Sequence, residues 1–246
     1  MIKLEVCIDS VAGAKAAEKG GANRVELCDN LVEGGTTPSF GMVEQCLESS
    51  NLPVMMMIRP RGGDFLYDKD EFEVMKRNVL HARTLGVMGV VFGMLTAEGD
   101  IDRAQTAQLV EAAGPLSVTF HRAFDMCRNP HKGLELLKEL GIARILTSGQ
   151  ESSAHEGIPL IRELIDLAGD QLIIMPGGGV NEKTLPDIVR LTQAKECHTS
   201  AKTTFPSKMK YFNPKVYMGV PGSAEYEIKS VSAKRVAAIL RTLDSN

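Results

Sequence analysis

Short apolar segments alternate with longer amphipathic segments along most of the chain, and this regular repeat limits the possible fold more than any other feature. Eight segments have the composition of strands, at residues 3–8, 24–28, 54–59, 87–92, 116–121, 143–147, 172–175 and 196–200. Helical patterns separate them, and glycines such as Gly86 and Gly141 stand where helices should end. Eight units of about thirty residues predict a TIM (β/α)8 barrel, because a doubly wound sheet seldom contains so many evenly spaced units. We expect one domain over residues 1–246.

The segment at residues 202–229 departs from this spacing. It contains prolines, several aromatic residues and little helical periodicity, and a last helical pattern follows at residues 232–243. A packed loop, a lid over the barrel mouth and an oligomer contact are all compatible with this composition. We expect an irregular C-terminal segment with a final helix, and a homo-oligomer.

Composition narrows the class of protein. A net charge of -3 does not favour nucleic acid or anionic membranes as partners, and no apolar run reaches the ~18 residues of a membrane span. The five cysteines are scattered and form no CxxC pair, which argues against zinc ribbons, thioredoxin-type redox motifs and a disulfide framework. These features predict a globular cytoplasmic protein.

Two predicted strands, the first and the second, carry the same Glu-x-Cys pattern. The first contains Glu5-Val6-Cys7 and the second Glu26-Leu27-Cys28. Residues two apart on a strand share a face, so each strand places a carboxylate and a thiol on one side. If the strands are parallel neighbours, ~4.8 Å apart, Cys7 and Cys28 lie close enough to share one ion. The alternative is that both cysteines are small core residues.

The two carboxylates are expected deeper in the barrel than the thiols. An unpaired charge there would be costly, and Arg59, at the end of the third strand, is the partner that alternation favours for Glu5 and Glu26. Such a group is either a structural ion network or an acid–base pair, because buried carboxylates in like-charged company can have raised pKa values.

Loops that follow the strands form the active face of a TIM barrel. Gly178 and Gly179 precede the helix after the seventh strand, and Ser200 opens the loop after the eighth. Backbone N–H groups at such a helix start suit an anion, although a tight turn would also require glycine. Arg61, after the third strand, is a second candidate anion-binding residue.

A histidine ends the fifth predicted strand. A second one, His198, lies on the eighth. Imidazole at a barrel mouth is a common general acid or base, although either histidine, His121 or His198, could instead be hydrogen-bonded inside the barrel. The candidate catalytic residues are therefore His121, Glu26 and Arg59.

Six motifs resemble those of the CutC family of copper homeostasis proteins, and they occur in family order. They read VELC, EGGTTPS, RPRGGDF, TFHRAFD, LTSGQ and PGGGV. The resemblance covers essentially the whole chain and is least distinctive after Ser200. It implies a TIM barrel and a role in intracellular copper handling, with proposed Cu(I) ligands that match Cys7 and Cys28. Because Cu(I) is a soft ion that accepts two thiolates, such a pair is chemically suitable.

Two hypotheses follow. The first is a cytoplasmic protein that binds Cu(I) through Cys7 and Cys28 and sequesters it or hands it over. The second is an enzyme of unassigned chemistry acting on a phosphorylated or other anionic small molecule. In that case Gly178, Gly179 and Ser200 hold the anion, Arg59 and Arg61 orient the substrate, and His121 and Glu26 transfer protons.

Overall fold

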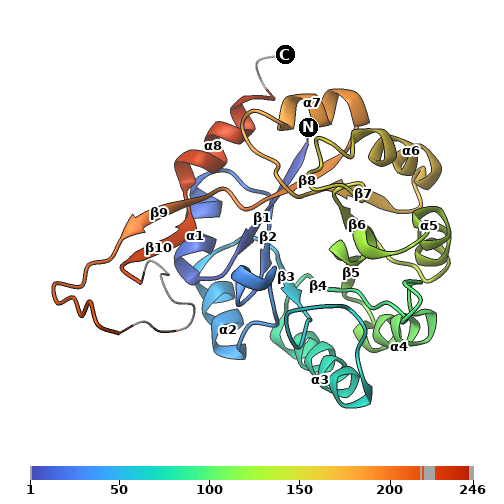
Figure 1. Cartoon of the computed structure of the whole chain (residues 1–246), viewed down its shortest axis with the longest axis horizontal. Helices are drawn as coiled ribbons and strands as arrows, with labels where there is room; N and C mark the ends of the chain where they lie inside the picture. The colour runs from blue at the N-terminus through green and yellow to red at the C-terminus, as the bar shows by residue number, and fades with distance from the viewer. Residues whose placement is uncertain (1, 217, 219–224, 244–246) are drawn as a thin grey trace.

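Eight parallel strands form a barrel in the computed structural model, which describes residues 2–216, 218 and 225–243. The strands are β1 (Lys3–Ile8), β2 (Arg24–Leu27), β3 (Val54–Met57), β4 (Gly89–Phe92), β5 (Ser117–Phe120), β6 (Arg144–Thr147), β7 (Ile173–Pro176) and β8 (Glu196–Thr199). Ladders join them in chain order from β1 to β7, β8 pairs with β1, and contacts between β7 and β8 close the ring (Figure 1). This arrangement confirms the predicted TIM barrel.

Helices surround the strands and alternate with them (Figure 1). They are α1 (Val11–Lys19), α2 (Phe40–Ser49), α3 (Lys69–Leu85), α4 (Arg103–Ala113), α5 (Pro130–Glu139), α6 (Ile158–Ala168), α7 (Leu185–Thr192) and α8 (Ala233–Arg241), with short 3-10 turns η1 (Leu31–Glu33) and η2 (Arg122–Met126). Side chains accept from the third backbone N–H at six helix starts, a bond that favours initiation there: Ser10, Ser39, Asp68, Asp102, Asn129 and Ser232.

Alternation along the strands separates two buried regions. Met56 faces the large core between strands and helices, whereas Met55 and Met57 point into the barrel beside Cys7 and Cys28. The interior of the barrel is therefore a packed layer of sulfur-containing side chains, with polar groups above and below it.

A charged layer fills the barrel below the thiols. Arg24 on β2 forms ion pairs with Glu5 on β1 and with Glu196 on β8, at 2.7 Å for the latter. Arg144 on β6 binds the same Glu196 oxygen at 2.8 Å. The expectation that Arg59 would pair with Glu5 was wrong, because the direct ladder partner of Glu5 on β2 is Arg24.

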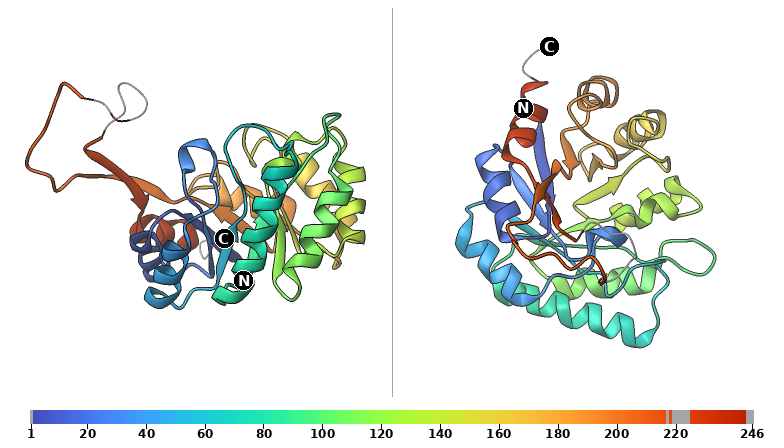
Figure 2. Two further views of the ribbon diagram at one scale, coloured as in Figure 1. Left: turned by 90° about the horizontal axis from the view of Figure 1, so that it is seen from below. Right: turned by 60° about the vertical axis from the view of Figure 1, so that its left-hand side comes forward.

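The irregular segment contains a two-stranded antiparallel sheet of β9 (Lys202–Pro206) and β10 (Glu227–Val231). This hairpin extends away from the barrel and does not cover its mouth (Figure 2). Its outer residues are mostly exposed, so neither a packed loop nor a lid describes it. Residues 217 and 219–224 of the predicted segment lie outside the described residues.

Candidate functional site

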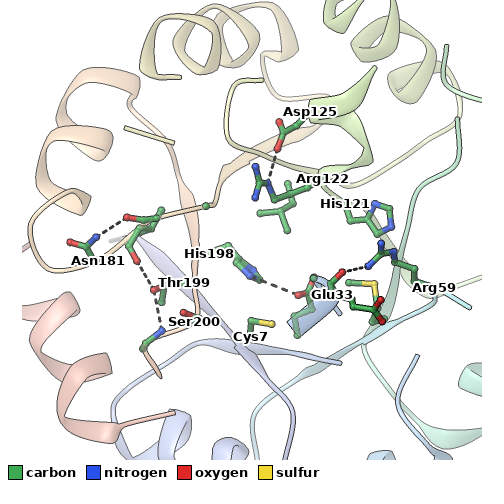
Figure 3. Close-up of a pocket in the computed structure, with 18 of the residues that line it drawn as sticks. Cys7, Glu33, Arg59, His121, Arg122, Asp125, Asn181, His198, Thr199 and Ser200 are labelled. Atoms are coloured by element: carbon green, nitrogen blue, oxygen red, sulfur yellow. Dashed lines mark hydrogen bonds and ion pairs between the residues drawn. The ribbon is translucent and has the colours of Figure 1, made fainter. Parts of the chain in front are cut away.

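The carboxyl ends of the strands surround a cavity of about 580 Å³ (Figure 3). Most of the candidate residues line it: Cys7, Glu26, Arg59, His121, Gly178, Gly179 and Ser200. Cys28 and Arg61 do not line it. The cavity lies at the end of the barrel where TIM-barrel active sites occur, and its volume is typical of small-molecule sites.

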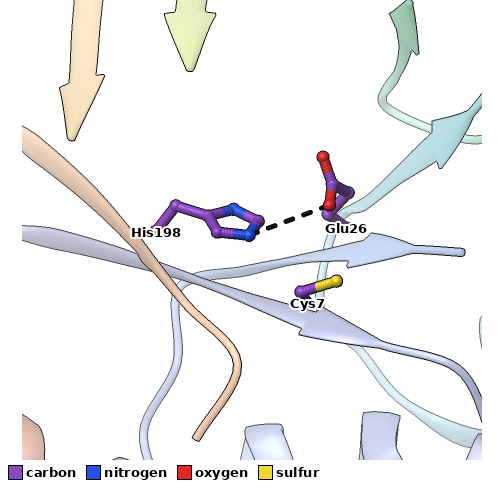
Figure 4. A group of neighbouring side chains, drawn as sticks. All are labelled: Cys7, Glu26 and His198. Carbon is purple, nitrogen blue, oxygen red and sulfur yellow. Dashed lines mark ion pairs between the residues drawn. The ribbon is translucent and has the colours of Figure 1, made fainter. Parts of the chain in front are cut away.

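Three of the side chains that line this cavity lie close together (Figure 4). The ligand atoms of Cys7, Glu26 and His198 all lie within 4.8 Å of one another, and His198 Nε2 is 3.8 Å from Glu26 Oε2. They come from three adjacent strands, since β1 pairs with β2 on one side and with β8 on the other. The cluster offers sulfur, nitrogen and oxygen donors to one point.

The second thiol lies directly behind this cluster. Cys28 is 1% exposed, and its Sγ lies 3.9 Å from Cys7 Sγ and 3.5 Å from Glu26 Oε2. The structure thus brings together the two thiols that the Glu-x-Cys pattern predicts to be neighbours.

Glu5 lies one layer below Cys7, as expected, but Glu26 does not. Glu26 is the ladder partner of Cys7 and shares its layer, whereas Glu5 lies one layer lower between Arg24 and His198. The reason is the stagger of barrel strands: β2 is shifted along β1 by two residues, so Cys7 lies opposite Glu26 and not opposite Cys28.

Hydrogen bonding favours different protonation states for the two thiols. A hydrogen bond from Cys28 outweighs burial and lowers the pKa of Cys7 to about 5, with a further contribution from His198. The same bond, together with burial, raises the pKa of Cys28 well above its usual range. Cys7 is therefore a thiolate at neutral pH, and thiolates are the form that binds metals.

A buried network fixes the position of His198. Its Nδ1 lies 2.8 Å from Glu5 Oε1, and Arg24 holds the other oxygen of Glu5. Burial alone would raise the pKa of Glu5, but the bond to His198 and the charge of Arg24 lower it to about 2. With Nδ1 bound in this way, Nε2 of His198 points toward Glu26 and Cys7.

His121 and Arg59 lie apart from this cluster in the same cavity (Figure 3). No described hydrogen bond joins His121 to Glu26, which are the proposed proton-transfer pair. Arg59 donates to three backbone carbonyls, whereas Arg61 is turned away and binds Glu71 and Asp64.

The glycine loop after β7 forms another wall. Gly178 and Gly179 have φ values of +96° and +76°, which only glycine adopts easily, so the turn by itself accounts for both residues. Ser200 is exposed beside the loop, and the Thr199 hydroxyl donates to Val180 O at 2.7 Å. The structure places Gly178, Gly179 and Ser200 together, and the anion remains a prediction.

The charged layer is the part of the site that sequence reasoning missed. Arg24 stands two residues before Glu26, so alternation along β2 already places both side chains inside the barrel. His198 shares that interior face, because it is the ladder partner of Glu5.

Fold and site together define a TIM-barrel protein whose polar cavity is lined by one thiol, Cys7, with a second thiol, Cys28, directly behind it. The CutC family model matches residues 2–203, and the chain belongs to this family. A copper homeostasis protein cutC homolog of Mus musculus is 48% identical over 96% of the chain and 87% of that protein. A CutC protein of Chromobacterium violaceum is 46% identical over 98% of each chain.

Solved structures agree with this assignment. A CutC protein from Streptococcus agalactiae has a TM-score of 0.77 and 36% identity, over 81% of this chain and 99% of that one. Phosphoribosylanthranilate isomerase from Thermotoga maritima, at 9% identity and a TM-score of 0.59 over all of both chains, shares the barrel alone. None of the described helices has the length and apolar character needed to cross a membrane.

Proposed function

We propose that this protein takes part in copper homeostasis by binding Cu(I) through Cys7 and Cys28. The observation that carries the proposal is the 3.9 Å separation of the two Sγ atoms. Metal–thiolate bonds of about 2.3 Å, the length found for zinc, would let one ion bridge sulfurs at about this distance. Two thiolates suit a soft ion such as Cu(I), and the similar proteins of mouse and man carry copper homeostasis in their names.

The surroundings of the thiols support exchange of the ion. Cys7 lines the cavity, so an ion can reach the thiol pair from there, whereas Cys28 lies behind Cys7. Cys7 is already a thiolate at neutral pH, so only Cys28 has to lose a proton when a metal binds. We also propose a cytoplasmic location, which the five free cysteines support, since a reducing compartment keeps thiols free.

Anaerobic titration with Cu(I) against a strong competing chelator tests the copper proposal. We expect one tightly bound ion per chain, and its loss in the Cys7→Ser, Cys28→Ser double variant. Cys46→Ser is the matched control, because Cys46 is a buried thiol in the outer core and should be dispensable for binding. Undiminished affinity in the double variant would contradict the proposal.

We further propose that the β9–β10 hairpin joins two copies of the chain. Large apolar side chains are exposed on it, including Phe205 at 43%, Phe212 at 58% and Ile228 at 55%. We expect light scattering to give a multiple of 26.7 kDa for the unsubstituted protein. The Phe205→Ser, Ile228→Ser double variant should have the mass of one chain. Val32→Ser, at an exposed position on η1, is the control. A monomeric unsubstituted chain would contradict this arrangement.

A further inference from the structure

Arg59 is a buried cation without a carboxylate partner among the described residues. The residue is 5% exposed, and its guanidinium donates to three backbone carbonyls: to Glu33 O at 2.7 Å, Gly35 O at 3.0 Å and Gly63 O at 2.8 Å. Its Nε–H has no acceptor. Buried charges in proteins are normally paired, so this arrangement leaves one positive charge for which the described residues supply no counter-ion.

The nearest acidic side chain does not fill this role. The Glu33 carboxylate is exposed and accepts from Asn30, while only the backbone carbonyl of Glu33 binds Arg59. The Glu26 carboxylate contacts Cys28 and His198. The charge of Arg59 therefore remains available to something outside the chain.

His121 supplies a second unused donor. Its Nδ1 accepts from the Ala123 N–H at 3.2 Å, so in the neutral ring the proton must be on Nε2, which has no partner. Burial, with the charge of Arg59, lowers the pKa of His121 to about 3. The ring is therefore neutral at ordinary pH and offers one N–H that can donate but cannot release a proton to a base of physiological strength.

The two residues that carry these donors belong to the same wall of the cavity. The Phe65 ring packs against each of them, with its centroid 5.0 Å from the His121 centroid and 5.1 Å from Arg59 Cζ. Phe65, Arg59 and His121 all line the cavity, and Figure 3 shows the two polar side chains next to each other. Buried donors normally have acceptors, so two that lack one at the same wall indicate that a bound molecule supplies the acceptor.

The geometry points to a site for the carboxylate of a small organic acid, whose oxygens accept from Arg59 Nε–H and His121 Nε2–H. One unpaired positive charge beside a neutral donor matches the single negative charge of a carboxylate. A phosphate monoester would bring a second negative charge that nothing at this wall neutralises. Phe65, Met57 and Leu146 line the same cavity and suit the apolar body of such an acid. The site goes beyond the copper proposal and uses neither cysteine.

Histidine-selective ¹⁵N NMR on the full chain tests the site, with acetate, pyruvate and succinate as probes and inorganic phosphate for comparison. We expect saturable binding of at least one carboxylate, with a shift of the His121 Nε2 resonance. His121→Asn should weaken binding about tenfold or more, the size expected for one hydrogen bond to a charged group. Its side-chain oxygen can still accept from Ala123, so the local turn is preserved.

Two further variants complete the design. Arg59→Lys should weaken binding to a similar extent, because lysine keeps the charge but lacks Nε–H, and Arg77→Gln, at an exposed arginine of α3, should bind as the unsubstituted chain does. Thermal unfolding verifies that each variant folds. If Arg59→Lys does not fold, the binding result for His121→Asn alone tests the site. Binding of phosphate alone, unchanged affinity in His121→Asn, or no saturation by any carboxylate up to about 20 mM would overturn the proposal. The copper titration can fail or succeed independently of each result.

Discussion

Arg24→Met is the substitution that most directly tests the charged layer inside the barrel. Arg24 is buried and holds two carboxylates, Glu5 and Glu196, neither of which can reach water. Removing one partner of a buried ion pair costs about 3–5 kcal/mol, because the remaining charge is left uncompensated. Arg144 still binds Glu196 and His198 still binds Glu5, so we expect a loss within this range at pH 7.

The pKa of Glu5 also predicts how the stability deficit of Arg24→Met changes with pH. The pKa of Glu5 in the folded chain is about 2, below its ordinary value of 4.5. Its ionisation therefore stabilises the fold above about pH 4.5, and this contribution is lost as the pH falls through 2. A shift of about 2.5 units corresponds to about 3 kcal/mol. Without Arg24 the pKa of Glu5 rises, so the deficit of the variant should shrink as the pH falls from 7 to about 3.5.

Urea unfolding at both pH values measures the effect. Arg77→Met is the matched control, because Arg77 pairs with Glu73 on the exposed face of α3, and such pairs contribute less than about 1 kcal/mol. The reasoning is refuted if Arg24→Met lies within about 1 kcal/mol of the control at pH 7. A deficit that stays constant or grows in acid would refute it equally.

Three other substitutions or reactions test separate features. Gly89→Ala should lower the free energy of unfolding, measured in urea, by at least about 2 kcal/mol, because the new Cβ would clash with Ser117 O across the β4–β5 ladder. The control is Gly41→Ala in α2, whose Cβ meets open space and which should be neutral or stabilising. Asp125→Ala should lower stability by about 2–3 kcal/mol, since the Asp125 carboxylate accepts several hydrogen bonds from the loop after β6. No measurable loss in this variant would show that these bonds contribute little. The alkylation rate of Cys7 by iodoacetamide, followed by mass spectrometry, should level off above about pH 6, because its pKa is lowered to about 5. A rate that keeps rising to pH 9 would contradict that pKa.

The sequence predicts the barrel well because its signals are local. Strand length, apolar character and helix-stop glycines depend on neighbouring residues, and each of the eight predicted strands begins within two residues of the observed one, as the first shows at Lys3–Ile8. The eighth also begins at the predicted residue, Glu196. The proximity of Cys7 and Cys28 follows from the same local pattern, since consecutive strands of this fold are neighbours.

The depth of a side chain within the barrel cannot be predicted from its neighbours in the sequence. Alternation tells which face a side chain takes, but the stagger between strands decides which layer it occupies. For this reason the partner of Glu5 is Arg24 and not Arg59, although both have suitable charge and parity. The role of His198 depends on the pairing of β1 with β8, which brings together residues 193 positions apart.

The pairing of the first strand with the eighth also sets the order in which the site can be assembled on the ribosome. Cys7 and Cys28 are separated by 21 positions, so both thiols emerge early and can meet as soon as β1 and β2 associate. Glu196 and His198 are synthesised last among the barrel strands, and until then Glu5 and Arg24 lack their partners from β8. A nascent chain therefore has its thiol pair long before it has the charged layer beneath it, and only release of the C-terminal part completes the barrel around them.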